Sequence, residues 1–198
     1  MLVPEASPHK SIAGLIAAGQ TAGARLNIGS INVGSTQHLA AEWLRIQANL
    51  VSVQVVPFNG TPALLQALRG GQVDAAVEIL GPVRPQVSAR AVRALALLGE
   101  SALPDLPDVP VVRDLPGMSS VNVSSLNALA APARTPRSVI ERLNREVAAA
   151  LAAPDVRKRL ADLNVRPRAS APDYLVRLLD ADIHRWSDVI QRAGIQRP

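Results

Sequence analysis

Cysteine is absent from this chain of 198 residues, and aromatic side chains are scarce. The lack of cysteine excludes disulfides, thiolate chemistry and Cys-ligated metals. Aromatic residues make up 2% of the chain, which argues against base-stacking platforms and aromatic sugar cages. Hydrophobic residues still make up 48%, so the sequence predicts a sizeable core built mainly from Ala, Leu and Val.

Long hydrophobic runs are also missing. No apolar run approaches the ~18 residues that a membrane span needs. The first residues lack a basic region followed by an apolar core, so we expect no export signal within this sequence.

Positive charge is concentrated toward the C-terminus. The formal charge is +5, yet residues 1–132 hold eight basic and eight acidic side chains. Residues 133–198 hold thirteen basic side chains interleaved with eight acidic ones. Mixed signs at helical spacing are typical of a solvated helix face with ion pairs, and we expect no nucleic-acid partner.

The first two thirds of the chain alternate between strand and helix patterns. Strands are predicted at about 25–28, 51–56, 73–78 and 91–98, with helices between them and one more at 11–20. This alternation predicts an α/β domain over residues 1–122 with a parallel sheet, and ligands at the carboxyl ends of its strands. Residues 100–117 are rich in proline and aspartate and are predicted to form a loop with an edge at Val111 and Val112.

The remaining residues predict a second, mostly helical segment over 123–198. Residues 121–131 are apolar and predict a strand that leaves the first domain. Three helices are expected, from Pro136 through Leu151, from about Pro154, and from Pro172 to Ala193 before Gly194.

Two turns between the first three predicted strands point to a ligand site. Ser35 is predicted to cap a helix after the turn at 29–34, and Thr61 to cap a second helix before Pro62. The start of a helix offers free N–H groups and the positive end of a dipole, which suit a small carboxylate. His38, one turn inside the first helix, is expected to hold its own loop by hydrogen bonding rather than to act in acid–base chemistry.

Several segments resemble the substrate receptors of tripartite tricarboxylate transporters, the Bug family. They read GSINVGSTQHLAAEW, VPFNGTPALLQALRGGQVDAAVE, VRALALL, ALPDLPDVPVVRDLPG and, from residue 129 to 195, LAAPARTPRSVIERLN through SDVIQRAGI. The resemblance covers nearly the whole chain in order, but it begins at about the middle of the family's pattern. It implies a periplasmic-binding-protein-like fold of type 2, with domain two complete and the C-terminal helices of an incomplete domain one.

The same resemblance implies a periplasmic receptor for a small carboxylate, with the membrane components of the transporter as further partners. We expect no cofactor and no metal, because cysteine is absent and no carboxylate pair shows ligand spacing around the three histidines. It also implies a set of ligand-binding residues on the two turns and the third strand: Ser30, Asn32, Gly34, Ser35, Thr36, Asn59, Gly60, Thr61 and Glu78.

Four positions depart from the family's pattern. Ile31 stands where a small polar residue is usual and Asn32 where a glycine is usual. Asn59 stands where a lysine is usual, and Glu78 where aspartate is common. An anion bound here would be held by neutral dipoles, which bind more weakly than a charged partner.

Three functions compete on these observations. The first is a carboxylate receptor feeding a transporter. The second is an α/β enzyme, disfavoured because the sequence has no nucleophile elbow, no phosphate loop and no paired carboxylates at a workable spacing. The third is a truncated paralogue that acts in interaction or assembly. Apolar faces on the last helices, including Val139, Leu143, Leu179 and Ile183, predict a homodimer.

Overall fold

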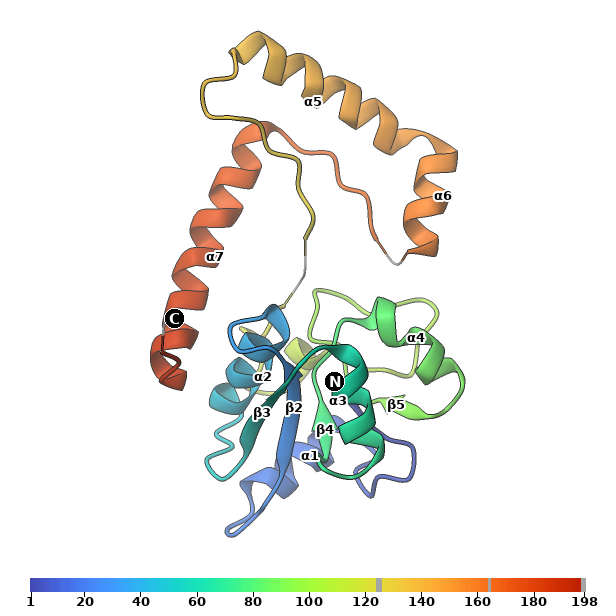
Figure 1. Ribbon diagram of the computed structural model, residues 1–198, viewed down its shortest axis with the longest axis vertical. Coiled ribbons are helices and arrows are strands. Elements are labelled where there is room, and N and C mark those ends of the chain that lie inside the picture. The colour runs from blue at the N-terminus through green and yellow to red at the C-terminus, as the bar shows by residue number, and fades with distance from the viewer. Residues whose placement is uncertain (124–125, 164, 197–198) are drawn as a thin grey trace. The chain divides into compact units, whose positions relative to one another are not determined.

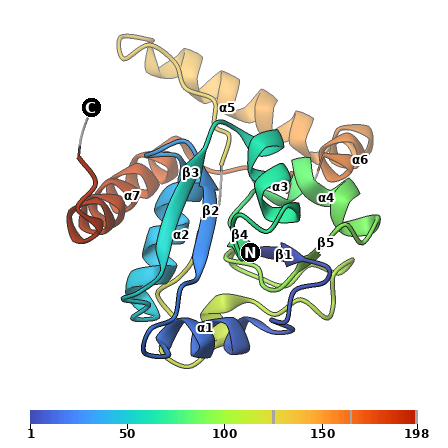
Figure 2. The same cartoon turned by 60° about the horizontal axis from the view of Figure 1, so that its bottom comes forward.

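The computed structural model describes residues 1–123, 126–163 and 165–196. Its elements divide between two compact units, one formed by residues 1–125 with 188–198 and the other by residues 126–187. Figures 1 and 2 show the course of the chain from two sides.

The first unit is built on a five-stranded sheet in the order β3-β2-β4-β1-β5. The strands are β1 (Leu2–Pro4), β2 (Asn27–Ile31), β3 (Gln54–Phe58), β4 (Ala75–Ala76) and β5 (Val92–Ala94). Strand β2 pairs in parallel with β3 and β4, whereas β1 is antiparallel to β4 and β5. The sheet is therefore mixed rather than wholly parallel, because β1, a strand that the sequence pattern did not predict, fills the gap between β4 and β5.

Four α-helices of this unit flank the sheet. They are α1 (Ile12–Gln20), α2 (Thr36–Gln47), α3 (Thr61–Arg69) and α4 (Leu80–Ser88). The chain crosses from β2 outward to β3 and then back past β2 to β4. Since such crossovers are right-handed, this reversal places α2 and α3 on opposite faces of the sheet. Figure 2 shows these helices around the twisted strands.

The core follows from this layering. On one face, side chains from α3 and α4 pack with residues of β1, β4 and β5 in a buried cluster: Leu2, Leu64, Ala67, Leu68, Val73, Ala76, Val83 and Val92. The opposite face carries Ile28, which lines a small cavity with Leu15 of α1. Leu64 and Leu68 are fully buried, so α3 is the main helical contribution to the first of these layers.

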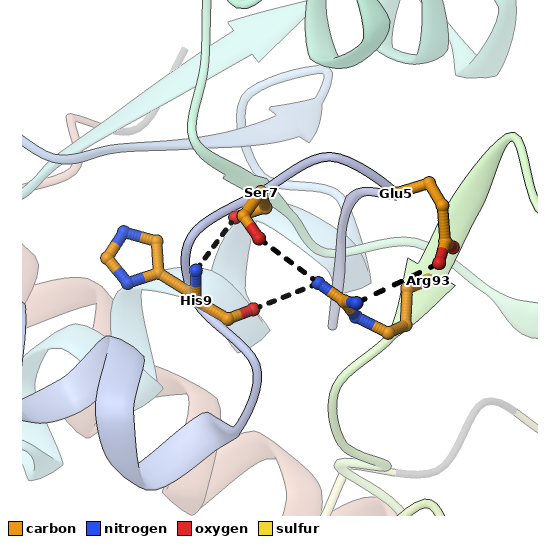
Figure 3. A network of polar contacts seen from close by, with 4 residues as sticks. All are labelled: Glu5, Ser7, His9 and Arg93. Carbon is orange, nitrogen blue, oxygen red and sulfur yellow. Dashed lines mark hydrogen bonds and ion pairs between the residues drawn. The ribbon is translucent and has the colours of Figure 1, made fainter.

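Arg93 on β5 fixes the connection between β1 and α1 (Figure 3). Its Nη2 donates to the carbonyl oxygens of Ser7 at 3.4 Å and His9 at 3.2 Å, and its Nη1 lies 3.8 Å from Glu5 Oε1. The backbone N–H of His9 donates to Ser7 Oγ at 3.2 Å. Because β1 runs antiparallel to β4, this network lies at the opposite end of the strands from their predicted ligand edge.

The segment after β5 differs from the sequence expectations. Val111 forms a single parallel bridge with Leu97, and a short 3₁₀ helix, η1 (Val112–Asp114), follows. The predicted strand at 121–131 is wrong for the described residues, 121–123 and 126–131, none of which is in a strand. Residues 124 and 125 of that prediction lie outside the described residues. An apolar run becomes a strand only where a neighbouring strand can accept its hydrogen bonds.

The C-terminal helices agree closely with the sequence prediction. They are α5 (Arg137–Ala152), α6 (Pro154–Asp162) and α7 (Pro172–Ala193). Exposed ion pairs at helical spacing join Arg137 to Glu141 and Lys158 to Asp162, which is the solvated face that the charge pattern indicated. In the described part of the chain, no helix is long and apolar enough to cross a membrane.

Candidate functional site

Ser35 shapes the turn between β2 and α2. Its side-chain oxygen accepts from the N–H of His38 at 3.1 Å and donates to the carbonyl of Ile31 at 2.6 Å. Its own N–H donates to the carbonyl of Asn32 at 3.0 Å. The prediction that Ser35 caps this helix is confirmed, and the two side-chain bonds fix the path of the chain from strand to helix.

His38 closes the same turn from within α2. The N–H of Gly34, a residue with φ of 80°, points at His38 Nδ1 at 3.4 Å. Burial lowers the pKa of His38, and the nearby Glu42 carboxylate opposes that shift to a smaller extent. The imidazole is therefore neutral at pH 7, and its contact with Gly34 agrees with the structural role expected from the sequence.

The second turn differs from its prediction in one respect. The residue that caps α3 is Gly60, with φ of 87°, and Thr61 is the first helical residue. The hydroxyl of Thr61 makes no capping bond; it donates to Glu78 Oε2 at 2.8 Å. The prediction of a Thr61 cap was wrong because a positive φ, which glycine tolerates, moves the start of the helix back by one residue.

Glu78 joins the two turns. It follows β4, and its Oε1 accepts from Gln37 Nε2 at 2.7 Å and from the N–H of Ile79 at 2.7 Å. Together with Thr61, Gln37 therefore ties the starts of α2 and α3 to one carboxylate. We name these three residues, Gln37, Thr61 and Glu78, the clasp.

The clasp lies where the sheet reverses its winding direction. After β2 the chain continues into α2 on one face of the sheet. After β4 it continues into α4 on the opposite face, where α3 also packs. A crevice outside the carboxyl ends of two such adjacent strands is the usual ligand position in α/β sheets. Gln37 was not among the predicted site residues. The only sequence signal is a polar residue in the first turn of a helix, and its partner depends on the order of the strands.

The remaining predicted residues surround the clasp or lie beneath it. The N–H of Asn32 donates to the carbonyl of Phe58 at 2.9 Å, which holds the two turns side by side. Asn32, Gly34, Thr36 and Asn59 are exposed. Ser30 is fully buried, and its Oγ has no hydrogen-bond partner among the described residues. The structure thus brings the predicted residues to one edge of the sheet, while their role in binding stays a prediction.

Fewer backbone N–H groups are free at the two turns than the sequence pattern predicted. Those of Asn32, Gly34, Ser35, His38 and Gly60 are all engaged within the turns. Within the described ranges, the N–H groups of Thr36 and Gln37 have no acceptor, as is usual in the first turn of a helix. These two are the donors that remain for an anion at the start of α2.

A groove of about 760 Å³ lies between α3 and α4 and shares only Thr61 with the predicted site. Its lining residues are Thr61, Pro62, Leu65, Gln66, Arg69, Gly70, Pro82 and Gln86. It runs along the outer side of these helices rather than over the strand ends, so we assign the candidate site to the clasp. The described residues include no group of three His, Cys, Asp or Glu side chains that could hold a metal ion.

Comparison with known proteins gives related sequences of greater length. Residues 1–195 match the family described as tripartite tricarboxylate transporter family receptor. A UPF0065 protein in the tcbD-tcbE intergenic region of Pseudomonas sp. (strain P51) is 33% identical over 190 residues, 96% of this chain and 56% of the relative. Protein BugT of Bordetella pertussis is 28% identical over 162 residues, 82% of this chain and 49% of BugT. The chain spans about half the length of these curated relatives.

Solved structures extend the comparison to the fold. MatC from Rhodopseudomonas palustris with bound malate is 31% identical, with a TM-score of 0.74, over 96% of this chain and 65% of MatC. An R. palustris protein with adipate is 26% identical, with a TM-score of 0.75, over 98% of this chain and 64% of that protein. The periplasmic binding protein BugD, at 23% identity and a TM-score of 0.77 over 100% of this chain and 66% of BugD, supports the fold alone. The α/β fold predicted from the sequence is confirmed, and the match over residues 1–195 shows that this chain belongs to the tripartite tricarboxylate transporter receptor family.

Proposed function

We propose that this chain acts as a solute-binding receptor, or as part of one, for a small carboxylate that it delivers to a tripartite tricarboxylate-type transporter in the periplasm. The observation that carries this proposal is the clasp, which holds two helix starts together at the carboxyl ends of β2 and β4. The malate and adipate bound by two related structures support a carboxylate as the ligand class. Residues 1–122 form the ligand-binding domain in this proposal.

The start of α2 is the proposed anchor for the carboxylate. The free N–H groups of Thr36 and Gln37 point along the axis of a helix of 12 residues, whose dipole favours a negative charge at this end. Asn32 and Asn59 are exposed beside this anchor and carry amide side chains that can donate further hydrogen bonds. No step of this binding requires a cofactor or a metal.

Replacing Thr36 with phenylalanine is expected to abolish carboxylate binding. Thr36 is exposed at the first helical position, so the larger side chain covers the free N–H groups without entering the core. A thermal-shift screen of mono-, di- and tricarboxylates measures the effect. At a ligand concentration of 100 times Kd, the bound ligand should raise the free energy of unfolding of the wild-type chain by about 2.7 kcal/mol, and it should leave that of the variant unchanged.

The matched control is Ser52→Phe, which introduces the same aromatic side chain at an exposed position before β3. This control should retain binding, and both variants should melt within a few degrees of the wild type. Carboxylate affinity that survives in Thr36→Phe would place the ligand elsewhere. A chain that binds no carboxylate, either alone or extended upstream to the length of its relatives, would favour the alternative role in interaction or assembly.

Self-association is the second part of the proposal and rests on the helices of the 126–187 unit. Large apolar side chains on α5 and α7 are exposed at helical spacing: Val139 (43%), Leu143 (51%), Val176 (58%), Leu179 (47%) and Ile183 (62%). Apolar stripes of this kind are rarely left in water and are typical of interaction surfaces. We propose that they bury against a second copy of the chain.

Light scattering should therefore report a dimer that separates when charge is placed on the stripe. Leu143→Glu with Ile183→Glu is expected to shift the mass to that of a monomer, because a carboxylate in an apolar interface loses its hydration. The control is Arg142→Glu, which changes an exposed charged residue of α5 outside the apolar stripe. A wild-type chain that is monodisperse and monomeric at high concentration would contradict the proposal.

A further inference from the structure

The net positive charge of the chain lies mostly in one short segment. Residues 157–168 hold five basic side chains and one acidic side chain. Residues 133–156 hold four basic and three acidic side chains, residues 169–198 hold four of each, and residues 1–132 are balanced. The segment 157–168 therefore supplies +4 of the formal charge of +5. Basic and acidic residues are mixed elsewhere in the C-terminal helices, and this segment is where that balance is lost.

All five basic side chains of this segment are exposed. Three lie on α6 and two in the stretch after it: Arg157, Lys158, Arg159, Arg166 and Arg168. The N–H of Val165 donates to the carbonyl of Leu160 at 2.8 Å, and this bond holds the beginning of that stretch against the last turn of α6. Arg168 lies over the ring of Tyr174, 4.6 Å from its centre, a contact that keeps its positive charge. We name the five exposed residues the basic patch.

Acidic groups neutralise only part of the basic patch. Asp162 is the one acid of the segment, and its Oδ2 lies 2.9 Å from Nζ of Lys158. Within the described residues, the side chains of Arg157 and Arg159 make no ion pair. The dipole of α6 is equivalent to about half an elementary charge at the end of the helix, so it cannot balance the remaining cations. The patch is thus available to a negatively charged partner.

Apolar side chains lie among these charges. Val156, Leu160 and Leu163 recur at spacings of four and three residues, which places them along one face of α6 and its end. Arg157 and Arg159 lie on either side of this face, since each is adjacent in sequence to one of its members. Leu163 is 68% exposed. An apolar face between arginines is typical of a helix that lies on a bilayer surface, where the arginines keep their charged ends in the headgroup layer.

An anionic bilayer surface is the partner that this combination fits best. Its headgroups form a continuous negative layer, so basic side chains on a helix and on the stretch after it can all reach phosphate oxygens without a fixed register. Beneath that layer lies an apolar boundary that can take up Leu163. An acidic protein segment supplies the negative charge but offers no such boundary.

We propose that the basic patch docks onto a surface of anionic phospholipid. Arg157 and Arg159 bind headgroup phosphates, and Leu163 enters the boundary between headgroups and acyl chains. This surface belongs to the 126–187 unit and uses neither the clasp nor the apolar side chains on α5 and α7. The inference therefore goes beyond the proposed function, and it holds or fails independently of carboxylate binding and of self-association.

Sedimentation with lipid vesicles tests this inference on the 198-residue chain. Vesicles made of equal parts phosphatidylglycerol and phosphatidylcholine should carry the chain into the pellet, whereas vesicles of phosphatidylcholine alone should leave it in solution. Binding should weaken as the ionic strength rises from about 0.01 M to about 0.15 M, because the Debye length falls from about 30 Å to about 8 Å.

Two matched double variants locate the contact. Arg157→Gln with Arg159→Gln is expected to weaken binding to the anionic vesicles by more than about tenfold, because each basic residue near such a surface contributes about fivefold. Arg137→Gln with Arg177→Gln removes the same formal charge from exposed positions on α5 and α7 and should weaken binding by less than about threefold. All four positions are exposed, so both variants should melt within a few degrees of the wild type.

A third variant separates a lipid from an acidic protein. Leu163→Gln keeps every charge of the basic patch but should also weaken binding to the anionic vesicles, since such binding scales with the buried apolar area. Equal binding to both vesicle types, or an equal loss in the two double variants, would overturn the inference. Binding to a glutamate-rich peptide as tight as to the vesicles, with no effect of Leu163→Gln, would assign the patch to an acidic protein and would overturn it as well.

Discussion

Replacing Gly29 with valine is expected to lower the free energy of unfolding by about 3 kcal/mol, because the centre of the sheet has no room for a side chain there. A Cβ atom added at Gly29 would lie 2.5 Å from Leu64 Cδ1 and 3.1 Å from Val73 Cγ2. Leu64 is fully buried in the layer that α3 forms over β2, so it has no free space to move into. Urea unfolding of the two proteins measures the difference.

The clash can be tested by a compensating change. Leu64→Ala alone should cost about 2–5 kcal/mol through the cavity that it leaves. In the double variant the valine partly fills that cavity, so the combined loss should be smaller than the sum by about 0.5–3 kcal/mol. Leu15→Ala, a buried leucine beside Ile28 on the other face of β2, is the control and should add to Gly29→Val without coupling. Additive losses for the pair of Gly29 and Leu64 would contradict this account of the packing.

Replacing Val189 with aspartate is expected to destabilise the first unit by about 3 kcal/mol at pH 8. Val189 lies near the end of α7, in the part of that helix that belongs to the first unit, and is 2% exposed. The change removes buried apolar surface and places an unpaired carboxyl group there. Gln191→Asp adds the same charge at an exposed position two residues away and should have little effect.

The loss caused by Val189→Asp should depend on pH in a defined direction. Burial disfavours the ionised form, so the pKa of the new carboxyl is raised in the folded protein above its ordinary value of about 3.9. The unfolded chain then gains stability relative to the folded one as pH rises through that interval. Unfolding measured at pH 5 and pH 8, each against the wild type at the same pH, should show the larger deficit at pH 8. A deficit that is equal at both values would mean that the carboxyl reaches solvent.

The features that the sequence predicted well are those decided by neighbouring residues. Ser35 caps α2 as expected, since a serine followed by helix-forming residues satisfies the first N–H groups without help from elsewhere. The bounds of α1 and α7 also agree with the prediction, because proline, glycine and apolar spacing act within a few residues. Family membership followed from the same local segments and is confirmed over residues 1–195.

The features that the sequence could not supply depend on partners far along the chain. Strand β1 is three residues long and became recognisable only through its pairing with β4 and β5. The apolar run after residue 121 was predicted as a strand, yet its described residues form none. Hydrogen bonds of a helix are made within the helix, whereas those of a strand need a second strand that local sequence does not specify.

The site shows the same division. The sequence placed Thr61 and Glu78 near each other through their positions at strand ends, but it assigned Thr61 to a helix cap and omitted Gln37. The strand order β3-β2-β4 decides that they meet, because it brings the starts of α2 and α3 to Glu78, two residues after β4. The sequence by itself therefore determined which residues form helix starts and strand ends, and the tertiary structure decided which of them share one carboxylate. The physical reason is that capping is a contact between near neighbours, whereas the clasp spans 17 and 41 residues and exists only once the sheet has assembled.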